Sequence, residues 1–294
     1  MTHDNSADRL AKVAKELRLA LATQADTGLA WLDGTVASLA GGPPDRVLFT
    51  AFAAAPRQLG RGELPDMVVD SVRLRGWTRD QAARVLLLLA RQPRDGTFLQ
   101  ALDSLFGAAD LAELVCLYQS LALLPFPERH VARAAEGVRS NMLPVFQAVA
   151  VGNPYPSEWL DEGSWNQMVV KAVFVGCLLH GIDGLDRRAN PTLARMLVDY
   201  ARERRAAGRV VTPDLWRPVG PFADTERALH ELRHALDGAD PLRRRAAALA
   251  LAASPSPDAK AVLDAQPDIA EAIRANLLSW QSLANEQAGM LAAA

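Results

Sequence analysis

Helix-forming residues dominate this chain, and proline and glycine divide it into short segments. Ala and Leu lead an apolar content of 50%, and apolar side chains recur at helical spacing, as in Leu10, Val13 and Leu17. Val and Ile form no alternating runs of the kind that a sheet requires. Breakers such as the run Gly41-Gly42-Pro43-Pro44 end the segments. The pattern therefore predicts an all-α fold.

Helices joined by short loops account for most of the chain. We expect them over residues 7–22, 28–39, 46–55, 79–92, 97–106, 109–124, 128–151, 161–180, 191–207, 213–219, 224–236, 241–253, 258–263 and 268–277. The apolar segment after Thr78 is long enough to favour a buried helix over a strand. Pro144 predicts a break near Met142, and Pro154 with Pro156 predicts a loop over residues 152–157.

The last quarter of the chain has the character of a helical repeat. The segment DPLRRRAAALALAAS, followed by PSPDAKAVL, resembles a HEAT-like hairpin with proline between its units. We therefore expect an irregular α-solenoid-like fold with HEAT-like hairpins at the C-terminal end. The expected division is a helical domain over residues 1–222, with a polar-rich central block at 128–222, and a short extension over 223–294. The alternative is one continuous domain.

Charge and hydropathy exclude several classes of protein. The formal net charge is −2, from 32 basic and 34 acidic residues, whereas nucleic-acid binders usually carry a basic stripe. The most apolar run, 168–182, is interrupted by Lys171, and the polar N-terminus has no secretory signal. Cys116 and Cys177 lie in apolar runs and are expected to be buried thiols. These features predict a cytoplasmic protein with no membrane insertion and no nucleic-acid partner.

The central block places polar residues among strongly apolar neighbours. Lys171 has apolar neighbours for more than two helical turns, so it is paired, reaches the surface or lines a pocket. Pairing with Asp183, Asp186 or Glu162 is the commoner outcome, because charges are rarely buried alone. If Lys171 instead lines a pocket, burial would lower its pKa. The predicted ligand site then comprises Arg139, Asn141, Tyr155, Asn166, Gln167, Lys171, Asp186, Arg188 and Asn190.

Within this block the chain resembles the EboA family. The resemblance rests on AAEGVRSNM, the NPYP loop, WNQMVVKAVFVG, GLDRRANPTLARMLVDYARERRAAGR and DLWRPVG, and it is strongest over residues 128–222. In YARERRAAGR, where an aromatic residue or His is expected, this chain carries Arg202 and Arg205. Basic clusters such as Arg202–Arg205 and Arg243–Arg245 are usually solvated helix faces, with phosphate or partner contact as the alternative.

The resemblance implies a pathway and no reaction. EboA-like proteins are encoded beside a UbiA-type prenyltransferase, a TatD-like hydrolase, a sugar-phosphate-isomerase-like protein and a cyclase resembling dehydroquinate synthase. In cyanobacteria this gene set is tied to movement of a scytonemin precursor to the periplasm, and in other bacteria to unidentified secreted metabolites. The implied partners are a small-molecule metabolite or the other proteins of the gene cluster.

A second motif, His230-Glu231-Leu232-Arg233-His234, matches the H-E-x-x-H pattern of zinc hydrolases. Asp240 stands where a third ligand could fall. The glycine expected three residues after the second histidine is displaced to Gly238, however, and an amphipathic surface helix explains the same residues. We therefore expect no metal or other cofactor, and His230, His234 and Asp240 are only weak candidates for a metal site.

Three hypotheses about function remain. The first is an accessory protein of secondary-metabolite biosynthesis or export that binds a small polar or phosphorylated intermediate or a pathway partner. The second is an enzyme of that pathway with a polar pocket around Lys171. The third is a zinc-dependent hydrolase that uses His230, Glu231 and His234. Whether the protein is an enzyme stays open at this point.

Overall fold

The computed structural model describes residues 3–23, 28–91 and 96–293, and it confirms the all-α class. The internal contacts divide the chain into two compact units, residues 1–160 (unit 1) and residues 161–294 (unit 2). The boundary expected at residue 222 and the solenoid-like, HEAT-like character stay predictions. Within the described residues, no helix combines the length and the apolar character that a membrane crossing requires.

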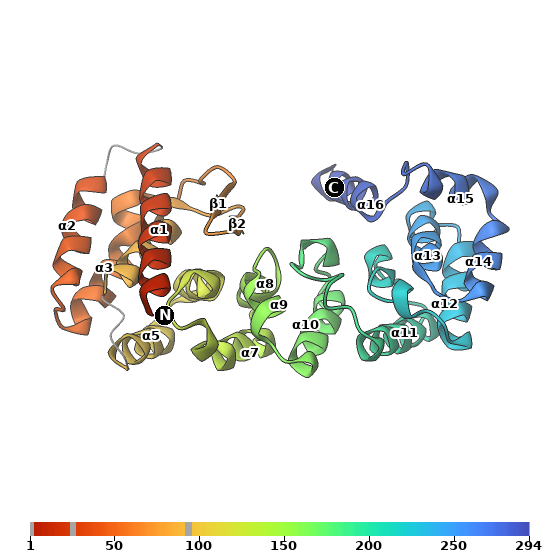
Figure 1. The fold of residues 1–294 in the computed structure, drawn as a ribbon, viewed down its shortest axis with the longest axis horizontal. Helices are drawn as coiled ribbons and strands as arrows, with labels where there is room; N and C mark the ends of the chain where they lie inside the picture. Colours follow the sequence, from red (N-terminus) through yellow and green to blue (C-terminus); the bar gives the residue numbers. More distant parts are fainter. Residues whose placement is uncertain (1–2, 24–27, 92–95, 294) are drawn as a thin grey trace. The chain divides into compact units, whose positions relative to one another are not determined.

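Unit 1 is built around one buried helix. Its elements are α1 (His3–Ala22), α2 (Leu29–Ala40), α3 (Asp45–Leu59), β1 (Met67–Val69), β2 (Val72–Leu74), α4 (Arg79–Ala90), α5 (Thr97–Ala108), α6 (Leu111–Gln119), η1 (Leu121–Leu123), η2 (Pro127–Arg129), α7 (Val131–Arg139), α8 (Leu143–Ala150) and α9 (Tyr155–Trp159) (Figure 1). Helix α4 packs against α1, α2 and α3. Residues 82–88 of α4 are all buried, which confirms the prediction of a buried helix after Thr78.

The all-helical prediction missed a small β-hairpin in unit 1. Strands β1 and β2 pair antiparallel, with Val69 opposite Val72. The two residues of the turn, Asp70 and Ser71, both have positive φ angles, 46° and 70°, as a tight hairpin turn requires. The Asp70 backbone N–H donates to the Glu16 carboxylate at 3.0 Å, so α1 holds the turn in place.

Pro154 and Pro156 do not keep the chain out of a helix, as was expected, because a short helix begins between them. The loop expected over residues 152–157 ends early, because α9 begins at Tyr155 with Pro156 in its first turn. A proline is tolerated there because the first-turn N–H groups have no partner inside the helix. The predicted break near Met142 is confirmed, since α7 ends at Arg139 and α8 begins at Leu143.

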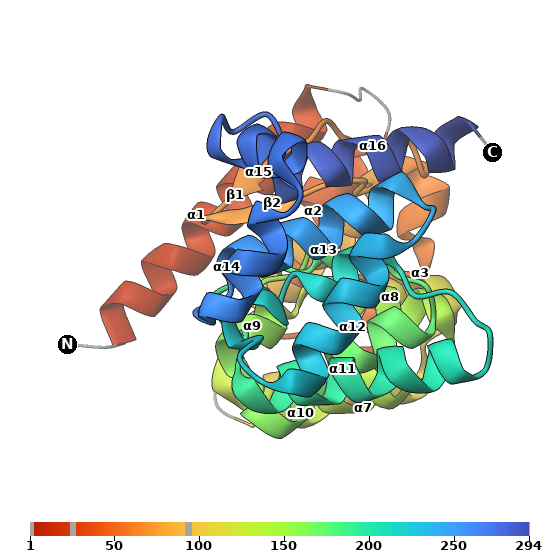
Figure 2. The same cartoon turned by 90° about the vertical axis from the view of Figure 1, so that its right-hand side faces the viewer.

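Unit 2 is organised around α13. Its elements are α10 (Glu162–Phe174), η3 (Leu179–Gly181), α11 (Pro191–Ala206), η4 (Pro213–Trp216), η5 (Gly220–Phe222), α12 (Glu226–Asp237), α13 (Pro241–Ala253), α14 (Pro257–Asp264), α15 (Pro267–Arg274) and α16 (Trp280–Ala293). Helix α13 packs against α12, α14, α15 and α16 (Figure 2) and buries residues 246–251. The helix expected to reach residue 180 ends at Phe174, and α16 was not predicted.

Candidate functional site

The predicted ligand residues are divided between the two units. Arg139, Asn141 and Tyr155 belong to unit 1, and Asn166, Gln167, Lys171, Asp186, Arg188 and Asn190 belong to unit 2. The contacts of each group are described separately. That these nine residues form one ligand site stays a prediction.

The unit 1 residues of this set have different surroundings. Tyr155 is fully buried, its hydroxyl donates to the Pro127 carbonyl, and burial raises the pKa of its phenol. Asn141 is exposed in the break between α7 and α8. Arg139 lines a cavity of about 370 Å³ together with Tyr118 and Arg133. Arg139 therefore borders a cavity that could admit a ligand.

Several unit 2 residues of the set bind one another. Asn166 and Asn190 exchange two side-chain amide hydrogen bonds, of 2.8 and 3.2 Å. The Asn190 side chain also accepts from the Leu193 backbone N–H and so caps α11. Asp186 accepts two bonds from Arg217, of 2.6 and 2.7 Å, on the surface. These contacts supply a structural role for Asn166, Asn190 and Asp186 that needs no ligand.

The surroundings of Lys171 agree with the apolar sequence around it. Its side chain is partly buried in α10, and burial lowers the pKa of its amine. Gln167, one turn earlier, is exposed, and the Arg188 guanidinium lies 4.9 Å from the centre of the buried Trp165 ring. Burial thus disfavours the charged form of the Lys171 amine.

A larger cavity, of about 570 Å³, lies in unit 1 where α4, α6 and α8 begin. We call it the α4–α6 cavity. Its polar lining consists of Arg61, Thr78, Asp80, Gln81 and Asp110. Its apolar lining consists of Leu111, Ala112, Val115 and Pro144. The volume and the mixture of apolar surface with a few polar groups are typical of small-molecule sites.

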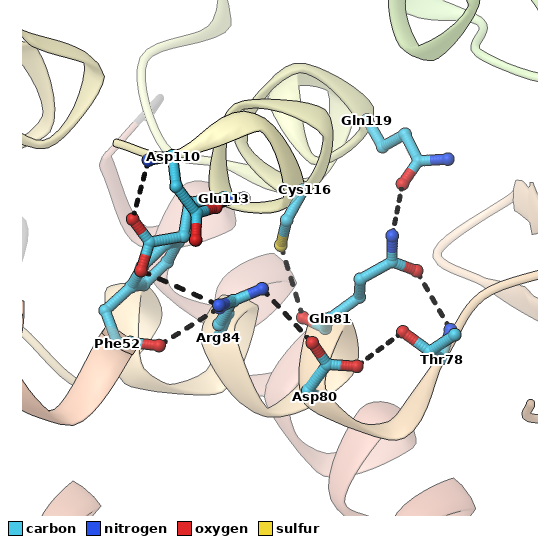
Figure 3. Close-up of polar contacts among 9 residues, drawn as sticks. All are labelled: Phe52, Thr78, Asp80, Gln81, Arg84, Asp110, Glu113, Cys116 and Gln119. Carbon is cyan, nitrogen blue, oxygen red and sulfur yellow. Dashed lines mark hydrogen bonds and ion pairs between the residues drawn. The ribbon is translucent and has the colours of Figure 1, made fainter. Parts of the chain in front are cut away.

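Buried charges fix the inner wall of this cavity (Figure 3). Arg84 is only 2% exposed, and its Nη1 donates to Asp80 at 3.1 Å while its Nε donates to the Phe52 carbonyl at 3.0 Å. Its Nη2 lies 3.6 Å from the Glu113 carboxylate on α6. A buried cation with two carboxylates and a carbonyl around it cannot turn without losing strong interactions. The network therefore holds Asp80 in one position at the cavity wall.

Helix caps complete the network and orient the polar lining. The Thr78 hydroxyl donates to Asp80 at 2.6 Å, and the Thr78 backbone N–H donates to Gln81 at 2.9 Å. Asp110 caps α6 by accepting from the Glu113 backbone N–H at 2.8 Å. Cys116 lies behind this wall, and burial raises the pKa of its thiol to about 12. A thiol with so high a pKa is a poor nucleophile.

The prediction of functional residues from sequence missed this cavity. One signal was present: Asp80 and Arg84 stand four residues apart in a helix that is otherwise mostly apolar, where charged residues need partners. The spacing alone could not identify the partner on α6. Glu113 comes from a segment 29 residues further along the chain, and its distance from Arg84 depends on how the helices pack.

The H-E-x-x-H residues have an arrangement that differs from a zinc hydrolase. Glu231 is 4% exposed, and both of its carboxylate oxygens accept from Arg205, at 2.6 and 2.9 Å. A glutamate held in this way is not available to activate water, as the zinc mechanism requires. Asp240 caps α13, and His230 is largely exposed. Among the described residues, no three His, Cys, Asp or Glu side chains gather closely enough to hold a metal ion.

Comparison with known proteins gives one match. A protein-family model described as metabolite traffic protein EboA matches residues 13–220, which is more than half of the chain. No curated protein and no solved structure matches it. The matched residues include the whole lining of the α4–α6 cavity.

Proposed function

Because this chain belongs to the EboA family, we propose that it is an accessory protein of secondary-metabolite biosynthesis or precursor export that holds a small metabolite in the α4–α6 cavity. A metabolite-related accessory role follows from the family itself. The α4–α6 cavity is the observation that supports this more specific role, because it joins a ligand-sized volume to a polar wall that is already held in place.

The lining indicates the kind of metabolite. Arg61 is exposed at the cavity and offers a guanidinium to a carboxylate, phosphate or hydroxyl group. Asp80 keeps unused acceptor capacity on its carboxylate oxygens, which suits a hydroxyl donor. Val115 and Pro144 provide apolar surface on the α6 and α8 side. We therefore expect an amphiphilic molecule with a polar end and an apolar part.

A cavity-filling variant tests this proposal. The protein is purified under mild conditions from cells that make it naturally, and released small molecules are identified by mass spectrometry. We expect the wild type to release one metabolite in near-stoichiometric amount and Val115→Trp to release little, because the indole takes up part of the cavity and obstructs the ligand. Val68→Trp is the matched control, since Val68 is 60% exposed on β1 and is not part of the cavity lining. Equal release from both variants, or no release from the wild type, would contradict the proposal.

An enzyme with its pocket around Lys171 is the second candidate, supported by the lowered pKa of that amine. Lys171→Met keeps the length and the apolar character of the side chain and removes the amine. In a strain that depends on this protein, Lys171→Met should abolish pathway output if Lys171 does chemistry, while the protein stays folded and its metabolite stays bound. Under the binding proposal, Val115→Trp should abolish pathway output and Lys171→Met should leave it unchanged.

A further inference from the structure

A separate cavity, of about 260 Å³, lies in unit 2 between the end of α11, the loop over residues 207–211, α12 and the start of α13. We call it the α11–α12 cavity. Its lining includes the guanidinium groups of Arg205, Arg209 and Arg243 and the carboxylates of Glu231 and Asp240, which leaves a net charge of +1. Such a concentration of guanidinium groups around a hollow favours an anionic occupant.

Both carboxylates of the lining already have partners. Glu231 accepts two bonds from Arg205, and Asp240 accepts from the Arg243 Nε at 2.8 Å and from the Leu242 backbone N–H at 2.9 Å. Their role is therefore to fix Arg205 and Arg243 in place. A guanidinium has five N–H donors, so both arginines keep donors beyond those used in these pairs.

Arg209 is carried by a loop that the backbone and Arg204 hold in one shape. Gly208 has a φ of +67°, which suits glycine, and it turns the chain back after α11. The Arg204 side chain donates two hydrogen bonds to the Val210 carbonyl, of 2.9 and 3.2 Å. Among the described residues, the Arg209 side chain has no ion pair. The backbone at Arg209 is thus held in place, and the charge of its side chain is available at the cavity.

Apolar residues, two glycines and His234 form the remaining wall. Trp216 is 2% exposed and lines the cavity together with Ala201, Val210 and Ala235. The volume of about 260 Å³ is just below the usual range for ligand pockets, about 300–1,000 Å³, so only a small ligand fits. A small ligand with one anionic group and one compact apolar group fits both walls.

We propose that the α11–α12 cavity binds a small organic oxyanion, a carboxylate or a phosphate ester, with Arg209 and Arg243 on the anionic group and Trp216 against the apolar group. Arg205, which Glu231 holds in place, adds positive charge to the cavity wall. This site is distinct from the α4–α6 cavity, and it includes residues beyond Gly220, where the family match ends.

Calorimetric titration of the full chain tests the site with three probes: 3-phenylpropionate, phenyl phosphate and the uncharged 3-phenylpropan-1-ol. We expect saturable 1:1 binding of at least one anion at physiological ionic strength, and much weaker binding of the alcohol. The anion that binds more tightly identifies the ligand as a carboxylate or a phosphate ester. Arg209→Ala and Arg243→Ala should each weaken anion binding by about tenfold, because each removes a charge-assisted hydrogen bond.

Matched variants separate this site from general charge effects and from the α4–α6 cavity. Arg202→Ala removes an exposed arginine of α11 that is not part of the cavity lining, and Val115→Trp fills the other cavity; neither should change anion binding. Arg209 is exposed, so Arg209→Ala should fold, which a thermal melt checks. Absence of anion binding, equal binding of the alcohol, or an equal loss in Arg202→Ala would overturn the proposal and leave the metabolite proposal intact.

Discussion

Arg84 is a buried cation in the core of unit 1, and its charge is compensated by neighbouring groups. Two carboxylates and a backbone carbonyl surround its guanidinium, and its Cζ lies 5.1 Å from the centre of the Phe52 ring. Such a buried group contributes little net stability over an apolar replacement of the whole network. Removing the cation alone has a different effect, because it leaves carboxylates buried without compensation.

Arg84→Met should therefore lower the free energy of unfolding by about 3–5 kcal/mol at pH 7. The methionine fills part of the volume, while Asp80 and Glu113 lose their cation. Urea denaturation followed by circular dichroism measures the change. Arg57→Met is the control, because Arg57 is exposed on α3, and its effect should stay within about 0.5 kcal/mol. Equal effects of the two variants would show that the pairing of Arg84 does not matter for stability.

Asp214 in unit 2 gives stability a pH dependence. It is 3% exposed, and burial raises the pKa of its carboxyl group above the ordinary value. The folded state thus binds the proton more tightly than the unfolded state does. The stabilisation that results from this tighter proton binding is fully present below the unfolded-state pKa, about 3.9. It is lost as the pH rises through the folded-state pKa. Above the folded-state pKa the ionised, buried carboxylate therefore lowers stability.

Asp214→Asn should raise the melting temperature at pH 7, and the gain should shrink as the pH falls toward 4. The asparagine oxygen can still accept the hydrogen bond that the Leu179 backbone N–H donates to this side chain. Melting curves at several pH values measure the difference. Asp237→Asn, at an exposed position on α12, should show no such trend. A variant less stable than the wild type at pH 7 would contradict this account.

Sequence could indicate which residues are unusual and could not indicate what they contact. Lys171 stands out in the sequence because its neighbours are apolar, and its side chain is partly buried in the structure. The partner of Glu231 was not predictable, because Arg205 lies 26 residues away on another helix. The local sequence around Glu231 matches a zinc motif. In the structure, α12 packs against α11, and the Glu231 carboxylate binds the Arg205 guanidinium.

At the scale of elements, periodicity predicted the long helices and failed where tertiary contacts decide. The strands β1 and β2 have three residues each, too few to show an alternating pattern. Their turn is held from outside by Glu16, and the ion pair of Arg9 with Asp70 adds to it. Helix α3 continues past the expected end at residue 55 to Leu59, with Pro56 inside it. Proline marks a probable helix end, and packing can override it.

Gly220 is a point of close contact between η5 and α13. A Cβ atom at this position would lie 2.8 Å from the Ala250 carbonyl oxygen and 2.9 Å from the Ala250 Cα, so the two backbones would have to separate. Gly220→Ala should therefore destabilise unit 2 by about 1–3 kcal/mol. Gly34→Ala is the opposite control: Gly34 lies inside α2 with open space around it, and alanine there should stabilise by roughly 0.5–1 kcal/mol. Thermal melts of both variants measure the effects, and a neutral Gly220→Ala would show that η5 and α13 can move apart easily.

For the whole molecule, the question is where the chain can be divided. The family match ends at Gly220, close to the boundary at residue 222 that the sequence suggests. In unit 2, however, α13 packs against η4 and η5, which lie before that boundary, and α12 packs against α11. Elements from both sides of residue 222 therefore share one core. Leu215 of η4 and Ala250 of α13, for example, are both fully buried. The division by contacts, after Leu160, cuts none of these pairs.

Three truncated chains distinguish the two boundaries. We expect residues 1–160 and residues 161–294 each to fold alone and to melt cooperatively, because each retains its own buried core. Residues 1–222 should melt as residues 1–160 do, with α11, η4 and η5 unprotected against amide hydrogen exchange, since α12 and α13 are missing. Slow exchange in α11 of the 1–222 chain would instead favour the boundary at residue 222. Because α13 is the helix on which η4, η5, α12, α14, α15 and α16 all pack, we expect its removal to unfold the rest of unit 2 and with it the α11–α12 cavity.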